Sequence, residues 1–138
     1  MKEMKYSTKR RFEILHEEDY KGYKIVIVNL GTHPTAYIGV TKGSILYEVS
    51  YDKLSEDGYY GIVHGGFTYS NFGLSDKYKD IWFIGWDYAH LGDYMGYYLE
   101  TSGMKRWTTK EILKEARKQV DDFLKLKLVK KEINVFKK

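Results

Sequence analysis

Residues 23–28, with the sequence YKIVIV, decide the fold. After Lys24 the run is apolar without a break and rich in β-branched side chains, a pattern typical of a strand covered on both faces. Residues 11–16 form a second β-rich run, and the acidic residues 17–19 together with Gly22 supply a turn between the two. The pattern therefore predicts a β-hairpin whose second strand is central in a sheet.

Further short apolar and aromatic runs follow on the C-terminal side of this hairpin. We expect strands at residues 36–40, 45–49, 59–63 and 81–86, because each run is bounded by glycine or other turn residues. Nine glycines between residues 57 and 103 divide the aromatic runs into short pieces, so the backbone there has to bend sharply or approach another segment closely.

A helix begins near Thr108, which can act as its N-cap, and Glu111 three residues later completes a capping box. An apolar stripe with helical spacing follows, formed by Ile112, Leu113, Ala116, Val120, Phe123 and Leu124. After Lys125 the pattern fits either a continuation of this helix or an edge strand. The sequence therefore predicts an α+β fold, a mainly antiparallel sheet with one long C-terminal helix packed on it.

The length of 138 residues is that of one domain, so we expect residues 1–138 to form a single domain, with residues 1–8 frayed and residues 126–138 flexible or at an edge. The chain has no cysteine, which excludes disulfides, thiolate zinc sites and cysteine nucleophiles. No apolar run is long enough to span a membrane, and no secretory signal is visible. The net charge of +4 is concentrated near the two ends of the chain.

Two glycine-flanked loops carry the candidate functional residues. In the first, VHGGFTYS at residues 63–70, the glycine pair removes side-chain bulk after His64 and could turn backbone amides toward an anion. The alternative for this loop is a tight turn without a ligand.

The second loop belongs to WFIGWDYAHLGD at residues 82–93, which places an imidazole between two carboxylates. On a helical turn, Asp87 and His90 would share a face, with Asp93 nearby. Such a group could orient an imidazole for acid-base chemistry or bind ribose hydroxyls. The alternative is a structural role, with Asp87 as a cap, His90 packed in the core and Asp93 on the surface.

Other classes of site are less well supported. Two histidines and two aspartates could supply four metal ligands, but the D-x-x-H-x-x-D spacing is not a sharp signature, so a divalent metal is a minor alternative. Walker, dinucleotide-binding and nucleophile-elbow motifs are absent from the sequence. The lysines are scattered and no nucleic-acid-binding module is visible, which does not favour nucleic acid as a partner.

Both loop motifs belong to a wider pattern. Together with His33-Pro34, Tyr37, Lys42-Gly43 and Leu46-Tyr47, they resemble a family of small phage and prophage proteins of uncharacterised function, over residues 33–124. Members read approximately HPxxxYVGVPxGHPLY, VHGGLTYS and WWFGFDCAHxGD. This chain departs from them at Trp86 and Tyr88, where Phe and Cys are common, and at Ser44-Ile45, where His-Pro is usual. A cysteine-dependent function is therefore in doubt here.

The resemblance implies a viral accessory protein acting in the cytoplasm of an infected bacterium, a class often directed against host defence. We expect it to bind and sequester a nucleotide-derived signal, of the cyclic nucleotide or ADP-ribose type, with a homo-oligomer as one way to complete the pocket. The expected ligand contacts are His64, Gly65, Gly66, Thr68, Tyr69, Trp86, Asp87, His90 and Asp93.

Two alternatives remain open at this stage. One is an enzyme that degrades such a molecule, with His64, His90 and Asp87 as catalytic residues. The other is a protein-binding inhibitor of a host defence factor that uses exposed tyrosines.

Overall fold

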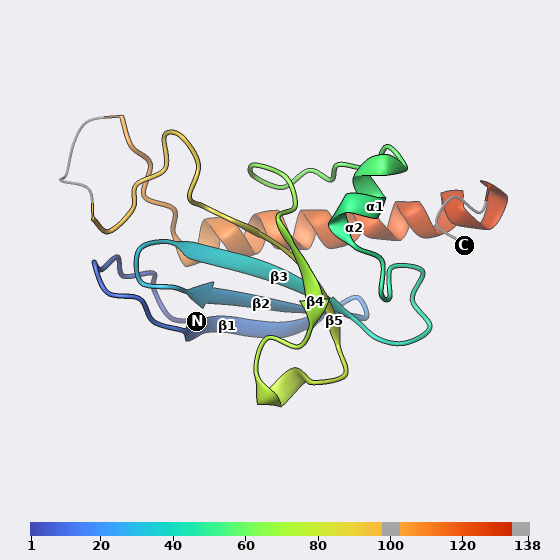
Figure 1. The fold of residues 1–138 in the computed structure, drawn as a ribbon, viewed down its shortest axis with the longest axis horizontal. Helices are drawn as coiled ribbons and strands as arrows, with labels where there is room; N and C mark the ends of the chain where they lie inside the picture. Colours follow the sequence, from blue (N-terminus) through green and yellow to red (C-terminus); the bar gives the residue numbers. More distant parts are fainter. Residues whose placement is uncertain (98–102, 134–138) are drawn as a thin grey trace.

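The core of the fold is a five-stranded antiparallel sheet with the strand order β1-β2-β3-β5-β4 (Figure 1). Its strands are β1 (Glu13–Tyr20), β2 (Tyr23–Asn29), β3 (Pro34–Val40), β4 (Tyr69–Phe72) and β5 (Trp82–Asp87). The structure, a computed structural model, describes residues 1–97 and 103–133, with side chains as far as residue 126. One long helix packs on the sheet, so the expected α+β class is confirmed.

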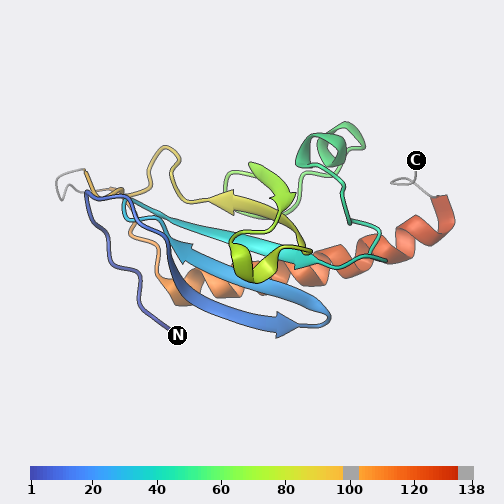
Figure 2. The ribbon, with the colours of Figure 1, turned by 60° about the horizontal axis from the view of Figure 1, so that its bottom comes forward.

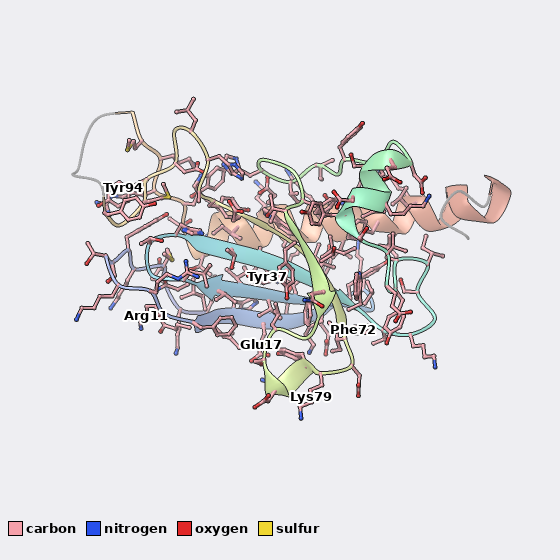
Figure 3. All side chains as sticks on the ribbon, in the orientation of Figure 1. Arg11, Glu17, Tyr37, Phe72, Lys79 and Tyr94 are labelled. Carbon is pink, nitrogen blue, oxygen red and sulfur yellow. The ribbon has the colours of Figure 1, made fainter. Side chains whose placement is uncertain are left out.

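Strand β2 is buried on both faces, as its apolar run predicts. Ile25 and Ile27 pack in the cluster that also contains the apolar stripe of the helix. Val26 and Val28 point the other way, into a second cluster with Tyr37 and other aromatic side chains, on the sheet face turned away from the helix (Figure 3). Both faces of the sheet therefore exclude water over the middle of β2.

The helix α2 (Thr109–Ile133) starts where the capping box predicts. The Glu111 amide donates to Thr108 Oγ1 (3.2 Å), and the Thr108 amide donates to Glu111 Oε1 (3.0 Å). The predicted stripe packs on the sheet, and α2 runs along one sheet face and extends past the ends of the strands (Figure 2). The segment after Lys125 continues this helix to Ile133, which resolves the alternative of an edge strand; residues 134–138 lie outside the described part.

Two of the expected strands are not strands. Residues 45–49 form successive turns, in which Ser44 accepts hydrogen bonds from the amides of Leu46 and Tyr47, because local bonding satisfies the backbone without a partner strand. Residues 59–63 are a loop tied to α2, since the Ile62 amide donates to the buried Gln119 side chain (2.8 Å). Part of each run packs on the core, as Leu46 and Val63 do, without pairing in the sheet.

The other differences concern element boundaries. Strand β1 continues through the acidic residues 17–19, and the hairpin turn lies at Lys21 and Gly22. The short helix α1 (Tyr51–Glu56), capped by Ser50, and the edge strand β4 were not expected. The one-turn 3₁₀ helix η1 (Asp76–Tyr78) lies between β4 and β5.

The N-terminal residues, expected to be frayed, instead run along the loops at one end of the sheet. The Ser7 amide donates to the carbonyl of Gly31 (2.8 Å), and the Tyr6 hydroxyl donates to the carbonyl of Trp107 (3.1 Å). Gly96 permits the close approach, because a Cβ there would lie 1.9 Å from the carbonyl oxygen of Ser7. These contacts give the polar backbone of the segment partners that a frayed end lacks.

In residues 1–97 and 103–133, no helix combines the length and the apolar character that crossing a bilayer requires.

A bidentate ion pair joins the edge strand β1 to α2 and should set the acid stability of the fold. Arg117 donates twice to Glu18, at 2.7 Å each, and His16 lies 2.8 Å from the same carboxylate. The hydrogen bonds from Arg117 lower the pKa of Glu18 from 4.5 to about 2. Because the pKa is depressed in the folded state, the stabilisation is complete above about pH 4.5 and is lost as the pH falls toward 2.

We expect Glu18→Gln to lower the free energy of unfolding at pH 7 by about 1–2 kcal/mol and to flatten its fall between pH 5 and pH 2. Urea unfolding at several pH values measures this. Glu17→Gln is the control, because it removes the same charge from the neighbouring, exposed pair with Lys77. Equal flattening in both variants would contradict the assignment.

Candidate functional site

The carboxylate of Asp93 is the centre of the candidate site. Its side chain is only 3% exposed, and it accepts hydrogen bonds from three segments of the chain. Its Oδ2 atom accepts from His64 Nε2 (2.7 Å) and from the His90 amide (2.9 Å), and its Oδ1 atom accepts from Trp107 Nε1 (2.9 Å). The alternative that placed Asp93 on the surface is therefore wrong: its carboxylate is buried, and the three donors offset the cost of desolvation.

His64 is held by packing as well as by this bond. Its ring stacks on Tyr88, with centroids 5.2 Å apart and planes 4° apart, and it lies 4.9 Å from the Trp107 ring. Because an ionised carboxylate only accepts hydrogen bonds, Nε2 carries the proton in the neutral imidazole, and Nδ1 is the basic atom. The side chain is 25% exposed, and within the described residues no partner contacts Nδ1.

His90 lies beside His64, with ring centroids 5.3 Å apart. Its Nε2 atom is 3.2 Å from Asp87 Oδ1, an ion-pair distance, but the geometry is not that of a hydrogen bond, and this buried atom has no hydrogen-bond partner in the described part of the chain. Gly65 makes room for the ring, because a Cβ at that position would lie 2.2 Å from His90 Nε2. The two loops thus pack closely because Gly65 has no side chain and the His90 imidazole occupies the space beside it.

Asp87 completes the group that we call the histidine cluster: His64, His90, Asp87 and Asp93. Asp87 ends β5, and its two oxygens accept from the Ala89 amide (3.1 Å) and from Thr68 Oγ1 (3.0 Å). The residues after Asp87 form a bend and a turn rather than the expected helical turn. The bend still brings the carboxylate to His90, because the Asp87 side chain bonds the backbone two residues later.

The structure does not bring every predicted residue to the cluster. Trp86 is 1% exposed in the core cluster shared with α2, so its ring cannot reach a ligand. Tyr69 lies on the edge strand β4, where its ring packs against Tyr37 (5.2 Å) on the other sheet face. The amide of Gly66 donates to the Val63 carbonyl (3.0 Å) in a turn. Contrary to our expectation, it is therefore not available to an anion.

Sequence reasoning missed three residues that shape the cluster. Tyr88 and Trp107 form the aromatic floor under His64. Tyr88 is anchored by hydrogen bonds to Glu115 (2.5 Å) and from Trp86 (2.8 Å), and burial raises its pKa, which keeps the hydroxyl neutral. Only the family pattern pointed at position 88, and nothing local marked Trp107.

His33 is the third missed residue. It precedes β3, whose partner is the end of β5, and the Tyr88 amide donates to the Pro34 carbonyl next to it (3.2 Å). Burial lowers the pKa of His33, against the opposing charge of Asp87. Antiparallel pairing of β3 with β5 is what carries this third imidazole to the same end of the sheet.

Two grooves adjoin the loop that carries His64. One, of about 260 Å³, is lined by Gly65, Gly66 and Phe67 together with tyrosines of the α1 region. The other, of about 320 Å³, is lined by Ile62, Trp107 and side chains of α2. Among the described residues, no group of three or more carboxylate or imidazole side chains is placed to hold a metal ion.

Comparisons of this chain with family models, with curated proteins and with solved structures found no match.

The contact between Gly65 and His90 can be tested with a matched pair of glycine substitutions. Gly65 and Gly66 both have positive φ angles, +71° and +79°, so alanine at either position costs about 1–2 kcal/mol of backbone strain. Only Gly65→Ala also collides with His90, since nothing lies within 4 Å of a Cβ at Gly66. We expect the His90 ring resonances in NMR spectra to shift strongly in Gly65→Ala and little in Gly66→Ala. Similar shifts in both would mean that the rings are not in contact.

The role of Asp93 predicts a difference between the two aspartates. Asp93→Asn replaces one acceptor oxygen with an amide, which leaves a buried donor unpaired, so we expect a loss of about 2–4 kcal/mol in the free energy of unfolding. Asp87→Asn, whose side chain is 26% exposed, should lose about 1 kcal/mol or less. Urea unfolding at pH 7 measures both values. An equal loss of stability in the two variants would show that the deeper burial of Asp93 does not make it more important for folding than Asp87.

Proposed function

We propose that the histidine cluster binds a small nucleotide-derived ligand, of the cyclic nucleotide or ADP-ribose type, and that the protein sequesters it. The observation that carries the proposal is that two glycine-flanked loops, far apart in sequence, bring His64 and His90 side by side with ring centroids 5.3 Å apart. The open Nδ1 atom of His64 and the partly exposed carboxylate of Asp87 can both accept hydrogen bonds from ribose hydroxyls.

The resemblance to phage proteins supports this ligand class, as do the groove beside Gly65 and Gly66 and its tyrosines, against which a base could lie. Under this proposal a second copy of the chain completes the pocket. Under this proposal the protein acts inside the infected cell, where such signals are made.

The bond between His64 and Asp93 favours a second candidate, an enzyme that cleaves the same class of ligand. A buried carboxylate that fixes Nε2 and leaves Nδ1 open is the arrangement a general base requires. His90, beside it, could act as the acid toward a leaving group. The two candidates share the site and differ in what happens to the ligand.

Isothermal titration against cyclic dinucleotides, cyclic ADP-ribose and ADP-ribose tests the proposal. We expect one of these to bind, and we expect His64→Gln to weaken binding at least tenfold, because the imidazole at the centre of the cluster is removed. His16→Gln is the control, since His16 also pairs with a carboxylate (2.8 Å) but lies on β1, in the groove between β1 and α2. Absence of binding across the panel by folded protein would contradict the proposal.

Mass spectrometry of the ligand released by heat separates the two candidates. An unchanged mass indicates sequestration. A changed mass that requires both His64 and Asp93 indicates catalysis.

A further inference from the structure

A further groove lies away from the histidine cluster, between β1 and α2. It encloses about 770 Å³, and its walls include Tyr20 from β1 and Leu113 from α2. Charged side chains of α2 make up most of the rest. What this groove could bind depends on which of these charges are already paired.

The acidic side chains of the groove are neutralised within the protein. Glu111 pairs with Lys105 (2.8 Å), and Asp121 pairs with Lys21 (2.9 Å). Arg117 supplies the one guanidinium in the groove, and this group already makes a bidentate bond to Glu18, which lies outside the groove. None of these groups therefore sets the net charge that a ligand would meet.

Three lysines of the groove, Lys110, Lys114 and Lys118, have no hydrogen-bond or ion-pair partner in the described part of the chain. All three are exposed. They follow one another at intervals of four residues, so their Cα atoms are about 6 Å apart along the helix axis. The helix thus converts lysines that look scattered in the sequence into a line of unpaired positive charges.

The line also borders the groove that contains Trp107. Lys114 and Lys118 line both grooves and form the ridge between them, together with Glu111, which is paired with Lys105. Glu115, whose carboxylate accepts from the Tyr88 hydroxyl, also lines the second groove. A chain-like anion lying along this ridge could contact several ammonium groups at once, whereas a single small anion could use only one or two. Repetition of the charge at a regular interval favours a polymer with regularly spaced negative charges.

We propose that the ridge formed by Lys110, Lys114 and Lys118 on α2 binds the phosphate backbone of single-stranded nucleic acid. Flexible lysine side chains at helical intervals can follow successive phosphates without reading the bases, so binding is independent of sequence and sensitive to salt. This site does not require the histidine cluster to bind or cleave any ligand.

Fluorescence anisotropy with a labelled oligothymidylate of twelve nucleotides tests the inference. At low salt we expect binding whose affinity falls at least tenfold in the triple variant K110E/K114E/K118E. The slope of log affinity against log salt should fall by about 2, because each lysine that neutralises a phosphate of a single strand releases about 0.7 counterions. The control is K9E/K42E/K79E, which makes the same change in net charge at exposed lysines elsewhere and should weaken binding less than threefold.

Three outcomes would overturn the inference. One is no binding to the wild-type protein at low salt, and another is an equal loss of affinity in the triple variant and its control. The third is tighter binding of polyglutamate of matched charge, which would make the ridge a site for acidic peptides. If the triple variant does not fold, Lys114→Glu alone should still reduce the salt slope by about 0.7. His64→Gln should leave this affinity unchanged, so failure here and failure at the histidine cluster are distinguishable.

Discussion

A carboxylate almost sealed from water organises the functional end of this molecule. Asp93 would be costly to bury alone, and three donors from separate parts of the chain make its burial tolerable. The dependence runs in both directions, because the loop of His64, the turn of His90 and the segment before α2 each owe part of their position to the same two oxygen atoms. The arrangement of these three segments thus depends on hydrogen bonds to one carboxylate as well as on apolar packing.

Contacts with the rigid core hold the His64 ring in position. Glu115 lies on α2 and accepts from the Tyr88 hydroxyl, and Tyr88 stacks flat on the imidazole. The long helix therefore supports the sheet through its apolar stripe and supports the site through one carboxylate. A side chain buttressed in this way keeps its geometry in the absence of a ligand, which is the condition for a preorganised site.

The sequence was informative where the signal was local and regular. The capping box at Thr108 placed the start of α2, and the unbroken apolar run placed β2, because both depend on residues within a few positions of one another. The placement of His64 and His90 in one site could also be anticipated, since each histidine lies in a glycine-containing loop that follows an apolar run.

Errors arose where tertiary contacts decided the outcome. Residues 59–63 look like a strand, but Gln119 of α2 binds their backbone. Trp86 was assigned to the site because it neighbours Asp87, yet its ring is buried in the core, where it donates to the Tyr88 hydroxyl. His33 and Trp107 reach the cluster through sheet register and loop closure, neither of which leaves a trace in the local sequence.

The irregularity in β1 has a consequence for how this protein can associate with other molecules. The register shifts between Ile14 and His16, and acidic side chains continue along this outermost strand. A bulged edge whose carboxylates pair with basic side chains, as Glu17 does with Lys77 and Glu18 with Arg117, is a poor template for hydrogen bonding to a foreign strand. Copies of the chain that meet in solution should therefore not pair through β1, and growth of the sheet into fibrils is disfavoured on that side.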